Sequence, residues 1–134
     1  ELVKIHHGTA IDRLGIRFTA MAPASLWAEM PVDERTIQPH GILHGGASLL
    51  LAESMGSVAS ALIAGPLGGR PVGIEISGSH LRPADSGHVT GVCRPLRIGL
   101  GLHFWRIAIF NLAGEQCCES RLTIKILRSG SGAG

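Results

Sequence analysis

The fold of this chain depends on residues 40–57, which read HGILHGGASLLLAESMGS. This segment enters a helical pattern of apolar residues that we predict to run from Leu43 to about Ala64. Within that run Glu53 is the only acid, and there is no lysine or arginine. A buried carboxylate costs several kcal/mol unless it is paired, protonated or used in function. Glu53 is therefore the first candidate for a functional residue.

The predicted helix has three different faces when successive residues are placed about 100° apart. Glu53 shares one face with Ser57 and Ser60, and a larger apolar face is expected to fill the core. The core face carries Leu51, Met55, Val58 and Leu62, and a third face of very small residues carries Gly45, Ala52, Gly56 and Ala59. Because glycine costs about 1 kcal/mol in a helix interior, we expect the small face to serve close packing against a sheet or a partner backbone.

The start of the helix, His44-Gly45-Gly46, offers backbone N–H groups that have no acceptor within the helix. These groups lie at the positive end of the helix dipole, where an anion or a developing oxyanion is stabilised. Glu53 lies about 12 to 14 Å from this end by the helical rise. A bound substrate would bridge part of that gap.

The composition indicates one globular domain and argues against two classes of partner. The chain has 134 residues, of which 45% are hydrophobic and 16% charged, and its formal net charge is +2. That length suits a single domain with a real core. The small net charge and the lack of a basic block argue against nucleic-acid binding.

The acid in the helix and the amphipathic flanking segments argue against a membrane span. The small excess of positive charge over negative charge suits a small polyanionic ligand.

The cysteines form no even disulfide framework and show no CxxC spacing. They are Cys93, Cys117 and Cys118. We therefore expect a reduced, cytoplasmic protein. His40 and His44 have the four-residue spacing of paired metal ligands on a helix, but the proline and glycine beside His40 argue against a helix there, and no third ligand is evident. The sequence predicts neither a metal nor another cofactor.

Strand patterns lie on both sides of the helix. Residues 16–30 form two alternating runs broken at Pro23, which predicts a hairpin. The glycine-rich residues 65–69 end the helix, and four alternating runs follow, which we expect to form a meander. Their apolar faces are predicted to carry Val72, Ile74 and Ile76, then Val89, Gly91 and Cys93, then Trp105, Ile107 and Ile109, and last Leu122, Ile124 and Ile126.

This order predicts an α+β fold in which an antiparallel sheet packs on one long helix. We expect a single domain over residues 1–128. The glycine- and serine-rich residues 129–134 are expected to form a flexible tail.

The same order of elements, with His-Gly-Gly opening the helix and Ala-Glu-Ser following, resembles the hotdog-fold acyl-CoA thioesterases. The chain looks most like the branch of glutamate-type 4-hydroxybenzoyl-CoA thioesterases and 1,4-dihydroxy-2-naphthoyl-CoA hydrolases. The resemblance runs from about Ile16 to Leu127 and implies a hotdog fold, an antiparallel sheet wrapped around one long central helix. It is carried by Gln38-Pro39, Leu43-His44-Gly45-Gly46-Ala47, Leu51-Ala52-Glu53-Ser54, Gly56-Ser57, His80-Leu81-Arg82, Gly91-Val92-Cys93 and Cys118-Glu119-Ser120-Arg121-Leu122-Thr123.

The resemblance implies a role for each matching residue. Glu53 would act as the nucleophile or as the base that activates water against the thioester carbonyl. The backbone N–H of Gly45 would polarise the carbonyl oxygen, with Gln38 and His44 assisting there or holding the thioester. Ser57 would orient the water or the carboxylate. By the same resemblance the active site would lie at a dimer interface.

Coenzyme A is expected to be held by two basic residues. His80 and Arg82 are two apart on a predicted strand, so they share one face, which could grip the CoA phosphates. His40 stands where the resemblance leads us to expect an aromatic or aliphatic residue near the acyl pocket. The acyl group is therefore left open.

The expected function is hydrolysis of an acyl-CoA thioester, with an aromatic acyl group such as hydroxybenzoyl or dihydroxynaphthoyl, to the free acid and CoA. We expect at least a homodimer, assembled further into a homotetramer. One alternative is an acyl-CoA binding module without catalysis. The other is a hotdog hydratase or dehydratase, which would need an Asp and His pair in place of the glutamate.

Overall fold

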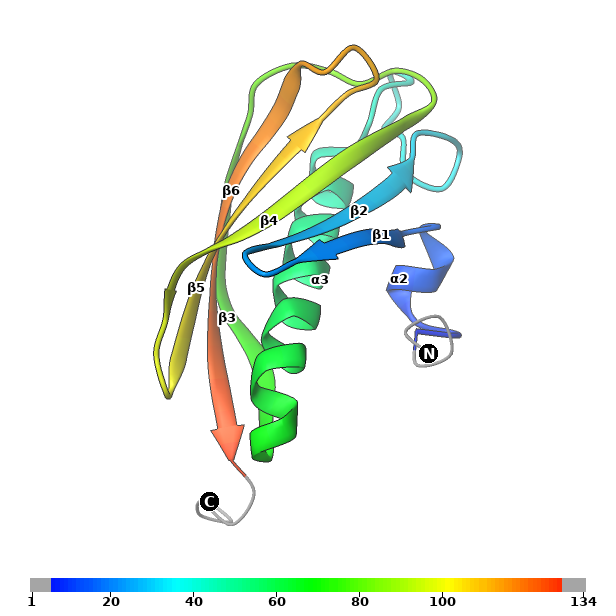
Figure 1. Ribbon diagram of the computed structural model, residues 1–134. Coiled ribbons are helices and arrows are strands. Elements are labelled where there is room, and N and C mark those ends of the chain that lie inside the picture. The colour runs from blue at the N-terminus through cyan, green and yellow to red at the C-terminus, as the bar shows by residue number, and fades with distance from the viewer. Residues whose placement is uncertain (1–5, 129–134) are drawn as a thin grey trace.

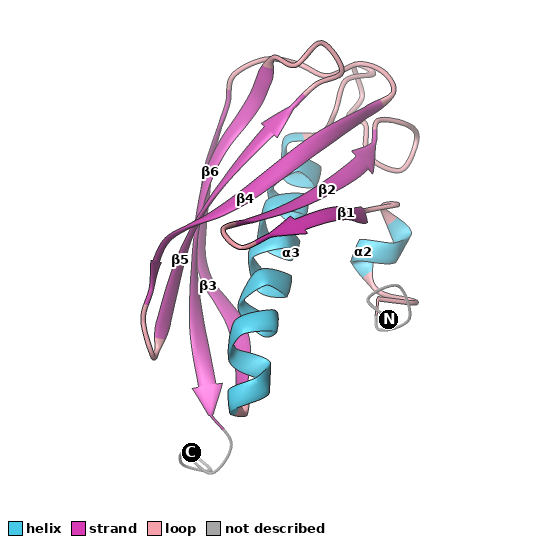
Figure 2. Cartoon of the chain, viewed as in Figure 1, coloured by secondary structure: helices cyan, strands magenta, loops and turns pink. Residues whose placement is uncertain are grey.

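The computed structural model describes residues 6–128, which form a six-stranded antiparallel sheet curled around one long helix (Figure 1). Figure 2 shows the elements by type. In chain order they are α2 (Ala10–Arg13), β1 (Arg17–Ala22), β2 (Ser25–Pro31), α3 (Gly45–Ala64), the 3-10 helix η1 (Gly65–Leu67), β3 (Gly69–His80), β4 (His88–Ile98), β5 (Leu102–Phe110) and β6 (Gln116–Arg128). The predicted α+β arrangement is confirmed. The tail expected at residues 129–134 lies outside the described residues.

The sheet order corrects the predicted meander. Within the described residues the strands lie in the order β1-β2-β4-β5-β6-β3. Only β4, β5 and β6 form a meander, whereas β3 pairs antiparallel with β6 at the far edge. Periodicity shows which side of a strand is apolar but not which strand it pairs with, so the sequence did not reveal this partner.

Strand β3 also contradicts the predicted facing of its side chains. Its register against β6 shifts between Gly73 and Glu75, which is a β-bulge at Ile74. Val72 and Ile74 are 40% and 55% exposed, while Ile76 packs against the core. The bulge changes the phase of the alternation, because one residue on β3 has no partner on β6. The prediction that all three residues face the core was therefore wrong for Val72 and Ile74.

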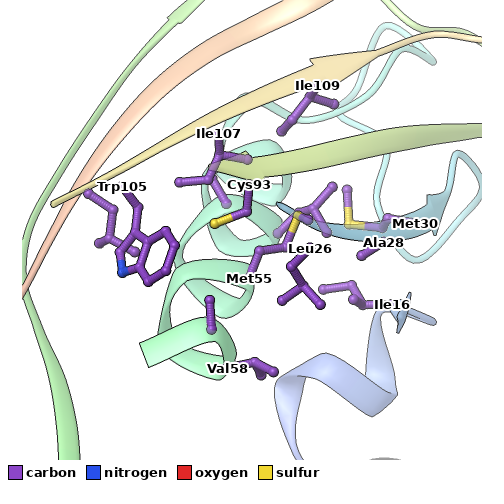
Figure 3. Close-up of a cluster of buried hydrophobic side chains, with 14 of the residues drawn as sticks. Ile16, Leu26, Ala28, Met30, Met55, Val58, Cys93, Trp105, Ile107 and Ile109 are labelled. Carbon is purple, nitrogen blue, oxygen red and sulfur yellow. The ribbon is translucent and has the colours of Figure 1, made fainter. Parts of the chain in front are cut away.

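The core lies between α3 and the concave side of the sheet (Figure 3). The small face of the helix meets the sheet as expected: a Cβ added at Gly56 would overlap Leu122 and lie 3.4 Å from Trp105 Cδ1. Met55 is fully buried, but Leu62 is 42% exposed, so its predicted core position was wrong. The sheet thus covers the helix less completely near its C-terminal end.

A chain of hydrogen bonds crosses the core from β5 to α3. Trp105 Nε1–H donates to Ser60 Oγ at 2.8 Å, and Ser60 Oγ lies 2.8 Å from His103 Nδ1. Because the Ser60 oxygen accepts from the indole, its own hydroxyl hydrogen is free to donate to the imidazole. Ser60, which the sequence places on the same helix face as Glu53, is fully buried in this network.

Within the described residues, Gly45–Leu67 is the segment whose length and apolar composition would allow it to span a membrane. More than half of its most apolar window, 56%, is buried inside the folded chain. This burial is typical of a core helix.

The buried His103 predicts a pH dependence of stability. Burial lowers its pKa, and the positive charge of Arg128 acts in the same direction, whereas a hydrogen bond to the Gly99 backbone opposes them. The unfolded chain, with a histidine pKa of about 6.5, then binds more protons than the fold. The free energy of unfolding should be highest above that pH and fall as the pH drops below it.

Chemical denaturation of the wild type and of His103→Gln, from about pH 8 to about pH 5, measures this effect. The fall in stability should be smaller in the variant. An equal fall in both proteins would contradict the assignment to His103.

Candidate active site

The N-terminus of α3 leaves one open donor. The N–H of Gly46 donates to His44 Nδ1 at 2.8 Å, so the histidine caps the helix. The N–H of Gly45 has no hydrogen-bond partner among residues 6–128. Of the backbone N–H groups that we expected to lack an acceptor at the helix start, the Gly45 N–H is therefore the one available to a ligand. With Nδ1 accepting, a neutral His44 carries its proton on Nε2.

Gln38 lies in a tight turn before the helix. The Gly41 N–H donates to the Gln38 carbonyl at 2.9 Å, and Gly41 has a φ of 83°. The His40 N–H donates to Gln38 Oε1. This bond occupies the side-chain oxygen, which leaves the amide NH₂ free as a donor.

A cavity of about 450 Å³ opens beside these two donors. It gathers four of the residues predicted from the sequence, namely Gln38, Gly45, His80 and Arg82. The remaining lining residues are Ile42, Leu43, Ser48, Leu81, Pro83, Ala84 and Cys117. The cavity thus combines a cluster of hydrogen-bond donors with apolar walls, which is typical of a site for an amphipathic ligand.

His80 lies against the helix N-terminus. A Cβ added at Gly45 would lie 2.8 Å from His80 Nε2, so a larger residue there would displace the imidazole. Arg82 lies beyond the last residue of β3, not on the strand as predicted. It donates to the Gln116 carbonyl at 3.1 Å and lies 3.9 Å from the Glu115 carboxylate. Both basic residues nevertheless line the same cavity.

Glu53 and Ser57 lie away from this cavity, one turn apart on α3. Both are half-buried in the single chain, so the Glu53 carboxylate is only partly removed from water. Within residues 6–128 the Glu53 carboxylate makes no hydrogen bond or ion pair, and it packs against the backbone of Gly73. An unpaired, partly exposed carboxylate is able to accept a proton or attack a carbonyl carbon.

The apolar wall of the cavity could not be recognised from the sequence. Cys117 and Ala84 come from different loops and strands, and neither belongs to a motif. Burial raises the pKa of the Cys117 thiol, so this part of the wall stays neutral. Gly73 did have a signal, because an isolated glycine inside a strand pattern indicates a bulge or a close approach.

No group of three or more His, Cys, Asp or Glu side chains that could hold a metal ion occurs in the described part of the chain.

Comparisons with known proteins agree on one family. The family model described as the thioesterase superfamily matches residues 40–118. A 1,4-dihydroxy-2-naphthoyl-CoA hydrolase of Escherichia coli (strain K12) is 49% identical over 120 residues, which is 90% of this chain and 88% of that protein. The proofreading thioesterase EntH of Cronobacter sakazakii is 48% identical over 120 residues, with coverages of 90% and 87%.

Solved structures agree with this family assignment. The crystal structure of thioesterase HI1161 from Haemophilus influenzae superposes with a TM-score of 0.94 at 38% identity. The match covers 99% of this chain and 92% of that chain.

The helix cap at His44 predicts an effect on stability. Replacing His44 with Ala removes the acceptor of the Gly46 N–H and should lower the free energy of unfolding by about 1 kcal/mol. His44→Asn keeps a side-chain acceptor and should cost less. Urea denaturation of both variants checks this, and equal losses would show that the cap does not contribute.

Proposed function

The chain belongs to the thioesterase superfamily, and we propose that it hydrolyses acyl-CoA thioesters whose acyl group is aromatic or otherwise bulky. It is a thioester hydrolase with the sheet-and-helix arrangement of the hotdog thioesterases. The observation that carries the proposal is the free Gly45 N–H, which opens into the cavity from the helix that also bears the unpaired Glu53. The naphthoyl-CoA hydrolase at 49% identity supports the aromatic acyl group.

In the proposed reaction the Gly45 N–H and the Gln38 amide donate to the thioester carbonyl oxygen. Negative charge develops on that oxygen when the carbonyl carbon is attacked, so fixed donors lower the barrier. Glu53 either takes a proton from the attacking water or attacks the carbon itself, forming an anhydride that water then cleaves. In both routes a tetrahedral intermediate collapses and the C–S bond breaks, which gives the free acid in the first route and the anhydride in the second. The CoA thiolate leaves and takes up the proton released by the water. His44 and Ser57 would assist by holding the thioester and the water.

Glu53 and Gly45 of one chain are too far apart to act on one carbonyl. They are separated by eight residues of helix, or about 12 Å along the axis. We infer that two chains complete each site, with Glu53 and Ser57 of one facing the Gly45 N–H of the other. The open edge of β3, where Val72 and Ile74 are exposed, supports pairing with a second copy. A homodimer is thus the smallest active unit we propose, and a homotetramer remains the larger assembly predicted.

Arg82 is the proposed anchor for the CoA phosphates. It is exposed at the rim of the cavity, where a guanidinium can bind a phosphate through two hydrogen bonds. His80 packs against Gly45 at the helix N-terminus and would contact the thioester end of the ligand.

Glu53 is the first residue to test. Glu53→Ala and Glu53→Gln should reduce turnover by at least about 100-fold, because the base or nucleophile is removed. Free thiol release is followed with acetyl, long-chain, benzoyl, hydroxybenzoyl and naphthoyl CoA thioesters. Glu34→Gln, at an exposed acid in the loop after β2, is the matched control. Retained turnover in Glu53→Ala would remove this residue from the mechanism. If the wild type binds CoA thioesters but cleaves none, the chain is a binding module.

Arg82→Gln should raise KM for acyl-CoA about tenfold and leave kcat nearly unchanged, since a phosphate contact is lost in ground state and transition state alike. The matched substrate is the same acyl group on N-acetylcysteamine, which has no phosphate. Its KM should not change. An equal effect on both substrates would contradict a phosphate contact.

A further inference from the structure

We propose that Gly73 and the β-bulge after it position the Glu53 carboxylate for catalysis. This inference rests on the proposed function, because it assigns a positioning residue to the same site. It concerns a contact between β3 and α3 that no sequence motif marks.

The contact is a close approach of the carboxylate to strand backbone. A Cβ added at Gly73 would overlap Glu53 Oε2 and would lie 3.3 Å from Cδ and 3.7 Å from Cγ. Any residue larger than glycine would therefore push the carboxylate away from its position.

Gly73 is required for space and not for its backbone conformation. The φ angle of Gly73 is not in the left-handed region, so another residue could adopt its backbone angles. The register of β3 against β6 shifts directly after it, at Ile74. Bulges of this kind re-aim backbone and side chains beside functional sites. Here the bulge follows the residue whose backbone faces Glu53.

Other interactions that could hold the carboxylate are lacking. Within residues 6–128 no residue forms a hydrogen bond or an ion pair with the Glu53 side chain. A glutamate side chain has several rotamers, so packing against Gly73 is what limits where its oxygens lie. Because a misplacement of about 1 Å can cost about 100-fold in rate, a displaced carboxylate should slow the reaction.

Gly78 provides a matched control on the same strand. A Cβ added there would lie 2.6 Å from Leu49 Cδ2, which is also the far end of a flexible side chain on α3. The two substitutions thus create similar crowding between β3 and α3. Only Gly73→Ala crowds the carboxylate.

The first test compares steady-state kinetics of the two alanine variants. Gly73→Ala should lower kcat about 100-fold and leave KM within about threefold, because binding is kept and alignment is lost. Gly78→Ala should retain kcat within about threefold of the wild type. Equal losses of kcat in both variants would overturn the inference, since general crowding would then explain them.

A second test combines Gly73→Ala with a shorter acid. Glu53→Asp withdraws the carboxylate by one methylene, which makes room for the new methyl group. The loss of kcat caused by Glu53→Asp should therefore be smaller in the Gly73→Ala background than in the wild type. Additive losses would overturn the inference.

A third test needs no activity. Removing the carboxylate with Glu53→Ala should reduce the drop in Tm caused by Gly73→Ala, because the new methyl group then no longer overlaps the carboxylate. If Gly73→Ala alone does not fold, the double variant should fold. A double variant as unstable as Gly73→Ala would overturn the inference.

The outcomes separate this inference from the function on which it rests. Full turnover in Glu53→Ala would contradict the proposed mechanism, while the Tm comparison would still report on the contact. Loss of turnover in Glu53→Ala together with wild-type kcat in Gly73→Ala would overturn the positioning role alone.

Discussion

Close packing of α3 against the curled sheet is the constraint on which the rest of the structure depends. Where the helix carries a residue without a side chain, at Gly56, the sheet fills the space with the large side chains of Leu122 and Trp105. Where β3 carries a glycine, at Gly73, the helix fills the space with the side chain of Glu53. The two surfaces are complementary along the helix, so neither can be enlarged without moving the other.

This packing places two reactive groups at different points along a single helix. Its N-terminus presents the Gly45 N–H to the cavity, while its middle carries Glu53 against β3. The donor and the acid are separated by the helix itself, which is rigid. The proposal that follows is a site completed by a second chain, with each helix contributing its N-terminus to one site and its carboxylate to the other.

The sequence was sufficient for the elements that have a strong period. The long helix, the hairpin before it and the strands after it all lie where the apolar alternation indicated. It was not sufficient for β3, because alternation does not report the pairing partner, and the bulge at Ile74 reverses the facing of its neighbours. For the site, motifs identified the donors around Gly45, whereas the cavity walls come from unrelated segments that only folding brings together.

The composite site is the central claim, and subunit mixing tests it most directly. Glu53→Ala and Gln38→Ala chains, each expected to be inactive alone, are refolded or co-expressed together, and thiol release from an aromatic acyl-CoA is measured. In a mixed dimer one site receives both substitutions and the other receives neither. Random mixing should therefore restore about a quarter of the wild-type sites. Mixed dimers that form but remain inactive would contradict a site shared between chains.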